Sequence, residues 1–513
     1  MLPPAGPAGP DAALERALDE ARERAVRALE PVMPVLVDLG RRFEAAGHEL
    51  SLVGGPVRDA FLGRRSADLD FTTDARPDDT VAILKRWGDA HWEVGRDFGT
   101  IGARKRSGGV DVVVEVTTYR SESYDPASRK PEVSYGDDLV GDLSRRDFTV
   151  NAMALRLPSL DFADPHDGLT DLAAGVLRTP VTAEQSFSDD PLRMMRAARF
   201  AAQLRLRVAP DVLEAMTAMS GRITIVSAER VRTELEKLLL AVDPVAGLRL
   251  LVDTGLAEHV LPELPALKLE IDEHHRHKDV YEHSLTVLQQ AIDREDGPDG
   301  EVPGPDLLLR LAALLHDVGK PRTRRFEEGG GVSFHHHEVV GAKMVAKRLK
   351  ALRFDNDTVK AVARLTELHL RFHGYGDGEW TDSAVRRYVT DAGPLLARLH
   401  KLTRSDCTTR NQRKANRLAA AYDDLEARIA RLREQEELDA VRPDLDGTAI
   451  MELLGIGPSR TVGRAYQHLL GLRMERGPLG EEAAREELLA WWAQQPESQQ
   501  PGSQQPGSQQ PGS

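Results

Sequence analysis

The stretch of the chain that most constrains its fold runs from residue 51 to residue 73 and reads SLVGGPVRDAFLGRRSADLDFTT. An apolar run precedes the pair Gly54-Gly55, a helix is predicted directly after that pair, and Asp68 and Asp70 follow in a second β-rich run. Two residues separated by one position on a strand point to the same face of the sheet. The pattern therefore predicts a strand, a tight turn, a helix, and a strand that presents two carboxylates together.

This arrangement is typical of a site for a nucleoside triphosphate and Mg²⁺. Hard cations prefer oxygen ligands, and one or two carboxylates plus substrate phosphates commonly hold them. Paired glycines let backbone amides approach a phosphate, and a helix start favours an anion. Two metals would activate an attacking hydroxyl and stabilise a leaving pyrophosphate. A third carboxylate is expected on the neighbouring β-rich run VDVVVEVTTYR, where Asp111 and Glu115 share a face, and we favour Glu115.

The hydrophobic period changes along the 513 residues and divides the chain into an α/β part followed by helical parts. Short β-rich runs dominate from about residue 48 to 160, and helical periodicity dominates afterwards. The predicted fold class is α+β, with a small mixed-sheet head and an all-helical neck and body. The predicted segments are 1–47, a disordered start and a helix with breaks at Pro31 and Pro34; 48–180, the head; 181–265, the neck; 270–415, a helical domain; 416–493, a C-terminal helical body; and 494–513, a disordered low-complexity tail.

The string GGPVRDAFLG followed by DLDF resembles the head signature of the polymerase-beta nucleotidyltransferase superfamily, in the branch of tRNA CCA-adding enzymes and bacterial poly(A) polymerases. Four more stretches, at 141–155, 164–178, 189–200 and 228–239, resemble motifs of that branch in the same order. We expect Asp68, Asp70 and Glu115 to be catalytic, with Mg²⁺ at the two aspartates. The nucleotide-binding residues that the resemblance implies are Gly55, Arg58, Arg146, Asp147, Asn151, Asp190, Arg193, Arg196 and Arg199.

Base selection is predicted in the segment DDPLRMMRAARF. Asp190 and Arg193 lie three apart, which makes them neighbours on a helix, and a carboxylate beside a guanidinium presents an acceptor and donors in one plane. In the family that this sequence resembles, such a pair selects CTP and ATP without a template. Asp189 stands where that family often has glutamate, a departure that leaves the pair itself in place.

A second group of candidate residues lies in the predicted helical body and follows the order H…HD…D. Imidazole and carboxylate together suit a transition metal. The order resembles the HD superfamily of metal-dependent phosphohydrolases, which implies a divalent transition metal and attack of an activated water on a phosphoester. His337 and His369 either complete a second metal position or lie outside the ligand set. The four core candidates are His283, His316, Asp317 and Asp406.

The head resemblance implies template-independent addition of CCA to the 3′ end of tRNA, with CTP and ATP as donors, pyrophosphate released, and an accessory HD activity. A poly(A) polymerase and a partial CC-adding or A-adding enzyme are alternatives. The basic run that sometimes marks the poly(A) branch after the DxD pair is not found, and GRDFGTIGARK stands there. Another alternative is an HD phosphohydrolase whose head only binds nucleotide. Asp68 and Asp70 argue against it, because paired carboxylates repel each other without a metal.

Charge and cysteine content narrow the remaining possibilities. The net charge of -14 argues against a nucleic-acid-binding surface that is basic throughout. Arginine is nevertheless dense at 193–207 and 404–417, and each stretch either faces phosphates or forms a solvated helix face. The single cysteine, Cys407, excludes an intrachain disulfide. Without a membrane-spanning run or a signal peptide, we expect a cytoplasmic protein with no membrane partner, and no protein partner is evident.

Overall fold

The computed structural model describes residues 10–66, 68–107, 110–123, 132–136, 138–268, 279–328, 332–375, 380–409, 411–436 and 442–496. The chain forms two compact units, residues 1–272 with 347–355, and residues 273–346 with 356–513. The tail that is predicted to be disordered begins at residue 494, and the backbone N–H groups of Gln494 and Gln495 donate to the carbonyls of Trp491 and Trp492. The rest of the tail, 497–513, and residues 1–9 lie outside the described residues. The segment boundaries drawn from the sequence stay predictions.

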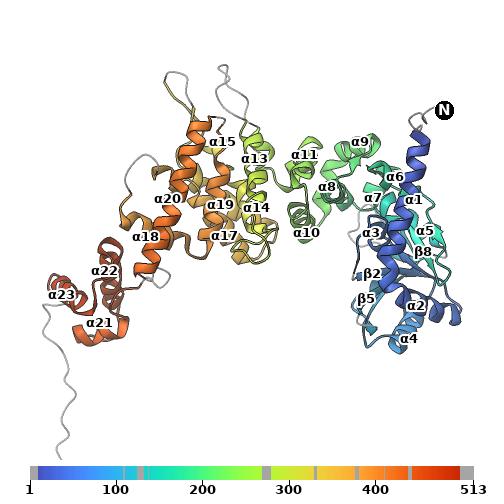
Figure 1. Cartoon of the computed structure of the whole chain (residues 1–513), viewed down its shortest axis with the longest axis horizontal. Helices are drawn as coiled ribbons and strands as arrows, with labels where there is room; N and C mark the ends of the chain where they lie inside the picture. Colours follow the sequence, from blue (N-terminus) through green and yellow to red (C-terminus); the bar gives the residue numbers. More distant parts are fainter. Residues whose placement is uncertain are drawn as a thin grey trace, which may run out of the picture. The chain divides into compact units, whose positions relative to one another are not determined.

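A seven-stranded mixed sheet forms the head in the first unit, and its strands β2, β5 and β8 are labelled in Figure 1. The strand order is β3-β4-β5-β2-β1-β8-β9. The central strand β2 pairs in parallel with β5 and antiparallel with β1. The β-rich runs predicted before the glycine pair, around Asp68 and Asp70, and in VDVVVEVTTYR form strands β1, β2 and β5. The strands of this sheet are β1 (Leu50–Val53), β2 (Asp68–Thr73), β3 (Ala90–Trp92), β4 (Thr100–Ser107), β5 (Val110–Thr118), β8 (Ala154–Leu157) and β9 (Phe162–Ala163), and β6 (Arg120–Ser123) pairs separately with β7 (Glu132–Tyr135).

Three helices of the first unit show how proline and apolar spacing set the local structure. Helix α1 (Pro10–Leu29) is followed by a 3-10 turn at Glu30–Val32 and by α2 (Met33–Ala45). Pro31 breaks the helix as predicted, but Pro34 does not, because it lies in the first turn of α2, where an N–H has no partner within the helix. The apolar face of α2 is buried, and α3 (Gly55–Phe61) follows the glycine turn.

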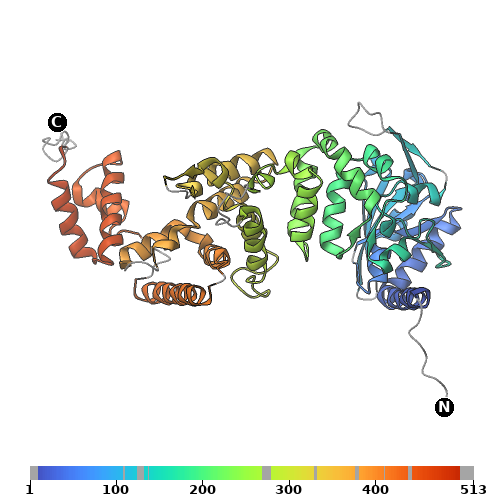
Figure 2. The same cartoon turned by 90° about the horizontal axis from the view of Figure 1, so that it is seen from above.

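The neck consists of helices that pack on one another within the first unit and are green in Figure 2. Helix α8 packs against α10 and α11. A Cβ at Gly247 of α11 would lie 2.6 Å from the carbonyl oxygen of Ala198, so glycine lets the two helices approach closely. The neck helices are α7 (Ala183–Asp189), α8 (Leu192–Leu204), α9 (Pro210–Met219), α10 (Ala228–Leu239), α11 (Pro244–Asp253) and α12 (Leu256–Val260), and α5 (Leu139–Ser144) and α6 (Gly168–Ala174) belong to the head.

In its described residues the second unit is helical, apart from a short pair of strands, β12 (Arg325–Phe326) and β13 (Val332–Ser333). Helix α14, with the sequence LLLRLAALL, is buried along almost its whole length and packs against α13, α17 and α19. An apolar helix buried on every side forms the centre of a helical core. The α+β fold is thus confirmed. The helices are α13 (Val280–Ile292), α14 (Leu307–Leu315), α15 (Lys320–Thr323), α16 (His337–Ala351), α17 (Asn356–Leu368), α18 (Asp382–Ala392), α19 (Leu396–Asp406), α20 (Gln412–Glu436), α21 (Gly447–Leu454), α22 (Arg460–Arg476) and α23 (Glu481–Trp492).

Among the helices that the structure describes, none is long and apolar enough to cross a membrane. The last three helices have a small core of their own, which includes Ile450, Leu469 and Leu488.

Candidate active site and candidate metal centre

The predicted catalytic carboxylates lie on the two central strands of the head. Asp68 and Asp70 are exposed on β2 while Leu69 between them is buried, so the two aspartates share a face as predicted. Glu115 on β5 stands opposite Asp70 in the strand register. Asp111 is bound to Arg104 on β4 instead. The structure therefore favours Glu115 as the third carboxylate.

The electrostatics around Asp70 fit a cation. Partial burial of its carboxylate in a cleft raises the pKa of Asp70, and the charges of Glu115 and Asp68 raise it further, while Arg146 lowers it. Like charges held this close favour a bound cation, because a cation relieves their repulsion. The oxygen-only donor set of Asp68, Asp70 and Glu115 suits a hard ion such as Mg²⁺.

The glycine turn brings backbone and guanidinium together beside these carboxylates. Gly54 has a φ of +73°, a conformation that glycine adopts without strain. A Cβ there would lie 3.0 Å from Nη1 of Arg146. Helix α3, which starts at Gly55, has only 7 residues, so arginine side chains have to supply most of the positive charge for a phosphate.

A cleft of about 530 Å³ in the first unit gathers the predicted nucleotide-binding residues. All nine of them line it together with Asp70, whereas Asp68 and Glu115 are not among its lining residues. Arginines outnumber acidic residues in the lining, which suits a polyanion. The lining residues are Gly54, Gly55, Arg58, Asp70, Arg145, Arg146, Asp147, Asn151, Asp190, Arg193, Arg196, Arg199, Phe200, Gln203 and Arg230.

A hydrogen-bond chain orients the polar groups of the cleft. Arg58 donates to the Asn151 side-chain oxygen at 2.6 Å, and Asn151 donates to Asp147 at 2.9 Å. Nε of Arg196 donates to the same carboxylate at 2.8 Å. Burial alone would raise the pKa of Asp147, but Arg196 and Asn151 lower it to about 2. Charges that are oriented in advance cost no reorganisation when a substrate arrives.

One prediction about this cleft is wrong: Asp190 and Arg193 are not neighbours on one helix. Asp190 follows the end of α7 in extended backbone, and α8 begins two residues later, because the residue before a proline avoids helical geometry. Asp190 accepts a hydrogen bond from Arg230 at 2.7 Å. Arg193 donates to the Ser186 hydroxyl at 2.9 Å and to the backbone carbonyl of Arg145. Both side chains still line the cleft.

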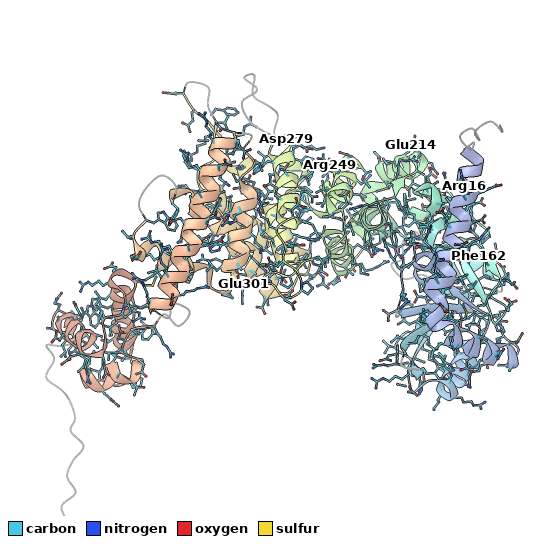
Figure 3. The ribbon with its side chains drawn as sticks, viewed as in Figure 1. Arg16, Phe162, Glu214, Arg249, Asp279 and Glu301 are labelled. Atoms are coloured by element: carbon cyan, nitrogen blue, oxygen red, sulfur yellow. The ribbon has the colours of Figure 1, made fainter. Side chains whose placement is uncertain are left out.

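The second group of candidates meets inside the second unit, and its six members are called the metal centre below. His283 lies on α13, which begins after its N-cap residue Asp279 (Figure 3). The two oxygens of Asp317 face different histidines: Oδ2 lies 3.2 Å from Nε2 of His316, and Oδ1 lies 3.2 Å from Nε2 of His337. This carboxylate therefore borders two groups of ligands. The metal centre consists of His283, His316, Asp317, His337, His369 and Asp406.

Backbone carbonyl groups orient three of the imidazoles of the metal centre. Nδ1 of His316, His337 and His369 lies 2.9, 2.8 and 2.6 Å from the carbonyl oxygen three residues earlier. A proton on Nδ1 bound to a carbonyl leaves Nε2 with its lone pair, the form in which histidine binds metal. Nε2 of His337 and of His369 is buried without a hydrogen-bond partner in the described part of the chain. These orphaned acceptors fit a bound cation.

The charges of the metal centre also favour a cation at its middle. Burial alone would lower the pKa of His316, but the carboxylates of Asp317 and Asp406 raise it to about 10. Burial and the nearby charge of His316 lower the pKa of His369 to about 3. Two buried carboxylates thus attract one positive charge. A mixed set of nitrogen and oxygen donors is the set that transition metals prefer.

Models of known protein families match both the part of the chain that contains the predicted catalytic carboxylates and the part that contains the metal centre. The family model described as "Poly A polymerase head domain" matches residues 50–178, "Probable RNA and SrmB- binding site of polymerase A" matches 205–267, and "HD domain" matches 280–432. The A-adding tRNA nucleotidyltransferase of Deinococcus radiodurans is 34% identical over 459 residues, which are 87% of this chain and 96% of that protein. The chain belongs to the tRNA nucleotidyltransferase family.

Other relatives of this tRNA nucleotidyltransferase are CCA-adding enzymes. The one from Levilactobacillus brevis is 37% identical over 244 residues, and the match spans 47% of this chain and 58% of the relative. The crystal structure of the Bacillus stearothermophilus CCA-adding enzyme in complex with CTP has a TM-score of 0.63 and 22% identity, over 89% of this chain and 96% of that one. This likeness shows that the fold is shared.

The structure adds residues to the nucleotidyltransferase site that sequence reasoning missed. Arg230 lies in the stretch 228–239, which resembles a motif of the family, but the resemblance assigns no role to a single residue of that stretch. Arg145 and Gln203 line the cleft as well. A sequence signal for Arg230 was absent, because its partner Asp190 lies 40 positions away.

Proposed function

We propose that this protein adds CCA to the 3′ end of tRNA, using CTP and ATP and releasing pyrophosphate. The observation that carries the proposal is the cleft in which all nine predicted nucleotide-binding residues meet Asp70. Its arginine-rich lining suits a triphosphate, and Asp70, which lines the cleft, stands opposite Glu115 in the register of β2 and β5. The names of the relatives, an A-adding tRNA nucleotidyltransferase and a CCA-adding enzyme, support tRNA as the acceptor.

Each part of the cleft has a distinct task in this proposal. Asp68, Asp70 and Glu115 would hold Mg²⁺, which supplies positive charge to the attacking hydroxyl and the triphosphate. Arg58 and Arg146 bind and orient the phosphates, because both border the glycine turn. A guanidinium presents several donors in a fixed plane, so each arginine can hold an oxygen pair in one orientation.

Asp190 and Arg193 select the base in this proposal, although they are not helix neighbours. Asp190 Oδ1 accepts the Leu192 N–H at 3.1 Å and Oδ2 is held by Arg230, so the carboxylate has one orientation. Arg193 is fixed by Ser186 and by the carbonyl of Arg145. A fixed acceptor and a fixed donor discriminate between bases, because a wrong base leaves one of them unpaired.

A-addition alone is the second candidate function. The relative that matches nearly its whole length is an A-adding enzyme, whereas the match to the Levilactobacillus brevis CCA-adding enzyme spans 58% of that protein. Both candidates use the same cleft and the same carboxylates. They differ in whether CTP is a substrate.

For the metal centre we propose two metal positions and an accessory phosphoester hydrolysis. His283, His316, Asp317 and Asp406 would hold the first divalent transition metal, and Asp317, His337 and His369 the second. A bound metal lowers the pKa of water and so supplies a nucleophile at neutral pH. The geometry of Asp317 supports a carboxylate shared by the two metal positions, since Oδ2 faces His283 and Oδ1 faces His337.

The experiment that tests the proposal is incorporation of labelled CTP and ATP, separately and together, into tRNA transcripts that end before CCA, after C and after CC. Products are resolved at single-nucleotide length in the presence of Mg²⁺. We expect only the missing nucleotides to be added, followed by a stop. Use of ATP alone on the CC transcript would establish A-addition, long A-tails would establish poly(A) synthesis, and no incorporation would refute nucleotidyl transfer to tRNA.

A further inference from the structure

Asp142 is a buried carboxylate in the head for which the scheme above has no task. It lies on α5, and its side chain is 0% exposed. Its Oδ2 accepts from the Thr72 hydroxyl at 3.0 Å and from Arg146 at 3.3 Å, and its Oδ1 accepts from Nε of Arg145 at 3.0 Å. Burying an ion is costly unless donors satisfy it, so a carboxylate with this many partners is a built feature of the head.

The partners of Asp142 lead to three different parts of the nucleotide site. Thr72 lies on β2 two residues after Asp70, on the strand face that carries the catalytic aspartates. Arg146 abuts the glycine turn, where its Nη1 would lie 3.0 Å from a Cβ on Gly54. The backbone carbonyl of Arg145 accepts a hydrogen bond from Arg193, the base-selecting arginine. One carboxylate is therefore connected to the strand, the turn and the base-selecting group.

We propose that Asp142 is a positioning residue, which holds Arg146 directly, and Arg193 through the backbone of Arg145, in register with the catalytic carboxylates of β2. This inference rests on the proposed nucleotidyl transfer and names a further residue on which that reaction depends. Arginine side chains lose rotamer freedom when they bind a ligand. An anchor that fixes them in the free protein moves this loss from nucleotide binding to folding.

Glu234, another buried acid near the cleft, makes a useful contrast. Nε of Arg199 donates to Glu234 at 2.6 Å, and both lie in the neck. Asp142, on α5, instead joins Thr72 of β2 to Arg145 and Arg146 in the segment that follows α5. Burial alone would raise the pKa of Asp142, but Arg146 and Arg145 lower it below its ordinary value, so the anchor is charged at neutral pH.

The first test is Asp142→Asn in the full-length protein, which keeps the shape of the side chain and removes its charge. We expect the KM for both CTP and ATP to rise roughly tenfold or more, the loss typical of a charge-assisted hydrogen bond, with a smaller change in kcat and an unchanged KM for tRNA. The matched control is Asp138→Asn on the same helix, because Asp138 only caps α5 through Gly141 and asparagine caps equally well. That control should match the unsubstituted protein.

A double-mutant cycle separates positioning from general destabilisation. In an Arg146→Ala background, Asp142→Asn should raise the nucleotide KM less than about threefold, because the guanidinium that it holds directly is gone and only the indirect link to Arg193 through Arg145 remains. Additive effects of the two substitutions would overturn the proposal, and so would an unchanged nucleotide KM in Asp142→Asn. If Asp142→Asn does not fold, Thr72→Val removes one donor at nearly constant shape and should also raise the nucleotide KM, whereas an unchanged KM would overturn the proposal.

Binding distinguishes a failure of this inference from a failure of the proposed function. If the unsubstituted protein adds no nucleotide to tRNA, the proposed function fails, but calorimetric titration with CTP and Mg²⁺ still tests Asp142. Weaker CTP binding by Asp142→Asn than by Asp138→Asn supports the positioning role. Equal binding by the two variants refutes it.

Discussion

The cleft in the head and the metal centre in the helical body both concentrate charge, but they do so in opposite ways. In the cleft the protein supplies the positive charge, from arginines that Asp147, Glu234 and Asp142 hold in place. In the metal centre the protein supplies lone pairs from histidine Nε2 atoms and two carboxylates, so a bound cation has to supply the positive charge. His316 and Asp317 there are at most 1% exposed, whereas Asp68 and Asp70 are exposed.

This difference matches the size of what each site has to bind. A triphosphate with a base needs donors spread over an open cleft, and flexible arginines have to be anchored to be effective. A metal ion needs a few donors at short range, and burial removes the water that would compete with them. The two sites should therefore respond independently to substitution, and each prediction below challenges or refines that contrast.

The largest effect is expected for Asp70→Ala, which removes a carboxylate at the centre of the cleft. Nucleotide addition should fall by roughly a thousandfold or more, while tRNA binding is largely retained. Incorporation of labelled nucleotide and a tRNA binding assay measure the two effects. Asp111→Asn is the control, because Asp111 pairs with Arg104 and should tolerate the change. A comparable loss of incorporation in His316→Ala would break the contrast between the two sites.

Removal of one histidine from the metal centre should affect metal content only. His337→Ala takes away a ligand of the second position, and we expect bound transition metal to fall from two ions per chain to one, or its affinity to drop by about 10 to 100-fold. Elemental analysis after dialysis measures the content. His336→Ala is the matched control, because His336 is next to His337 in the sequence but its own side chain is 83% exposed. Retention of both ions in His337→Ala would remove His337 from the ligand set.

Acid should weaken the helical body before the head. His400 on α19 borders a cavity of about 740 Å³ together with Glu301. Burial lowers the pKa of His400 to about 4, although Glu426 raises it. The pKa of this histidine is about 6.5 in the unfolded chain and about 4 in the folded protein. Between pH 6.5 and pH 4 the unfolded chain therefore binds a proton that the folded protein does not bind, so the free energy of unfolding decreases as the pH falls. Asp147, with a folded pKa of about 2, contributes its stability above the ordinary aspartate pKa and loses it only in stronger acid.

The matching variant is His400→Gln, which cannot take up that proton. The unsubstituted protein should lose on the order of 1 to 2 kcal/mol more than the variant when the pH drops from 7 to 5. Calorimetric melting of both proteins at the two pH values measures the difference. An equal loss in both would show that His400 does not set the acid sensitivity of the helical body.

The smallest effect is expected for Arg230→Ala. Arg230 orients Asp190, but its side chain is 54% exposed, so water screens the pair and its worth is below about 1 kcal/mol. We expect the KM for CTP and ATP to rise by at most about fivefold. Single-nucleotide addition kinetics measure it, with Arg232→Ala, on the same helix and paired with Glu236, as the control. A thousandfold loss of the nucleotide-addition rate in Arg230→Ala would show that Arg230 is catalytic, and it would refute a role limited to orienting Asp190.

The sequence by itself determined the features that depend on residues close together in the chain. Asp68 and Asp70 share a face because they are two positions apart on a strand, and Pro31 breaks a helix because it lacks an N–H. The order of the motifs predicted a head, a neck and the candidate residues of both sites, and the nine candidates for nucleotide binding line one cleft. The helix prediction for Asp190 failed where a local signal, the following proline, was not weighed.

The tertiary structure decided what depends on contacts between distant residues. Glu115 is preferred to Asp111 because of the register between β2 and β5, which no spacing within one strand reveals. Arg230 reaches Asp190 over 40 positions, and Thr72 reaches Asp142 over 70. Such pairs form only when packing of the whole unit brings them within hydrogen-bond distance, and neither partner carries a local pattern that marks it. Periodicity and motifs therefore identify the groups that react, and only the fold shows which groups hold them in place.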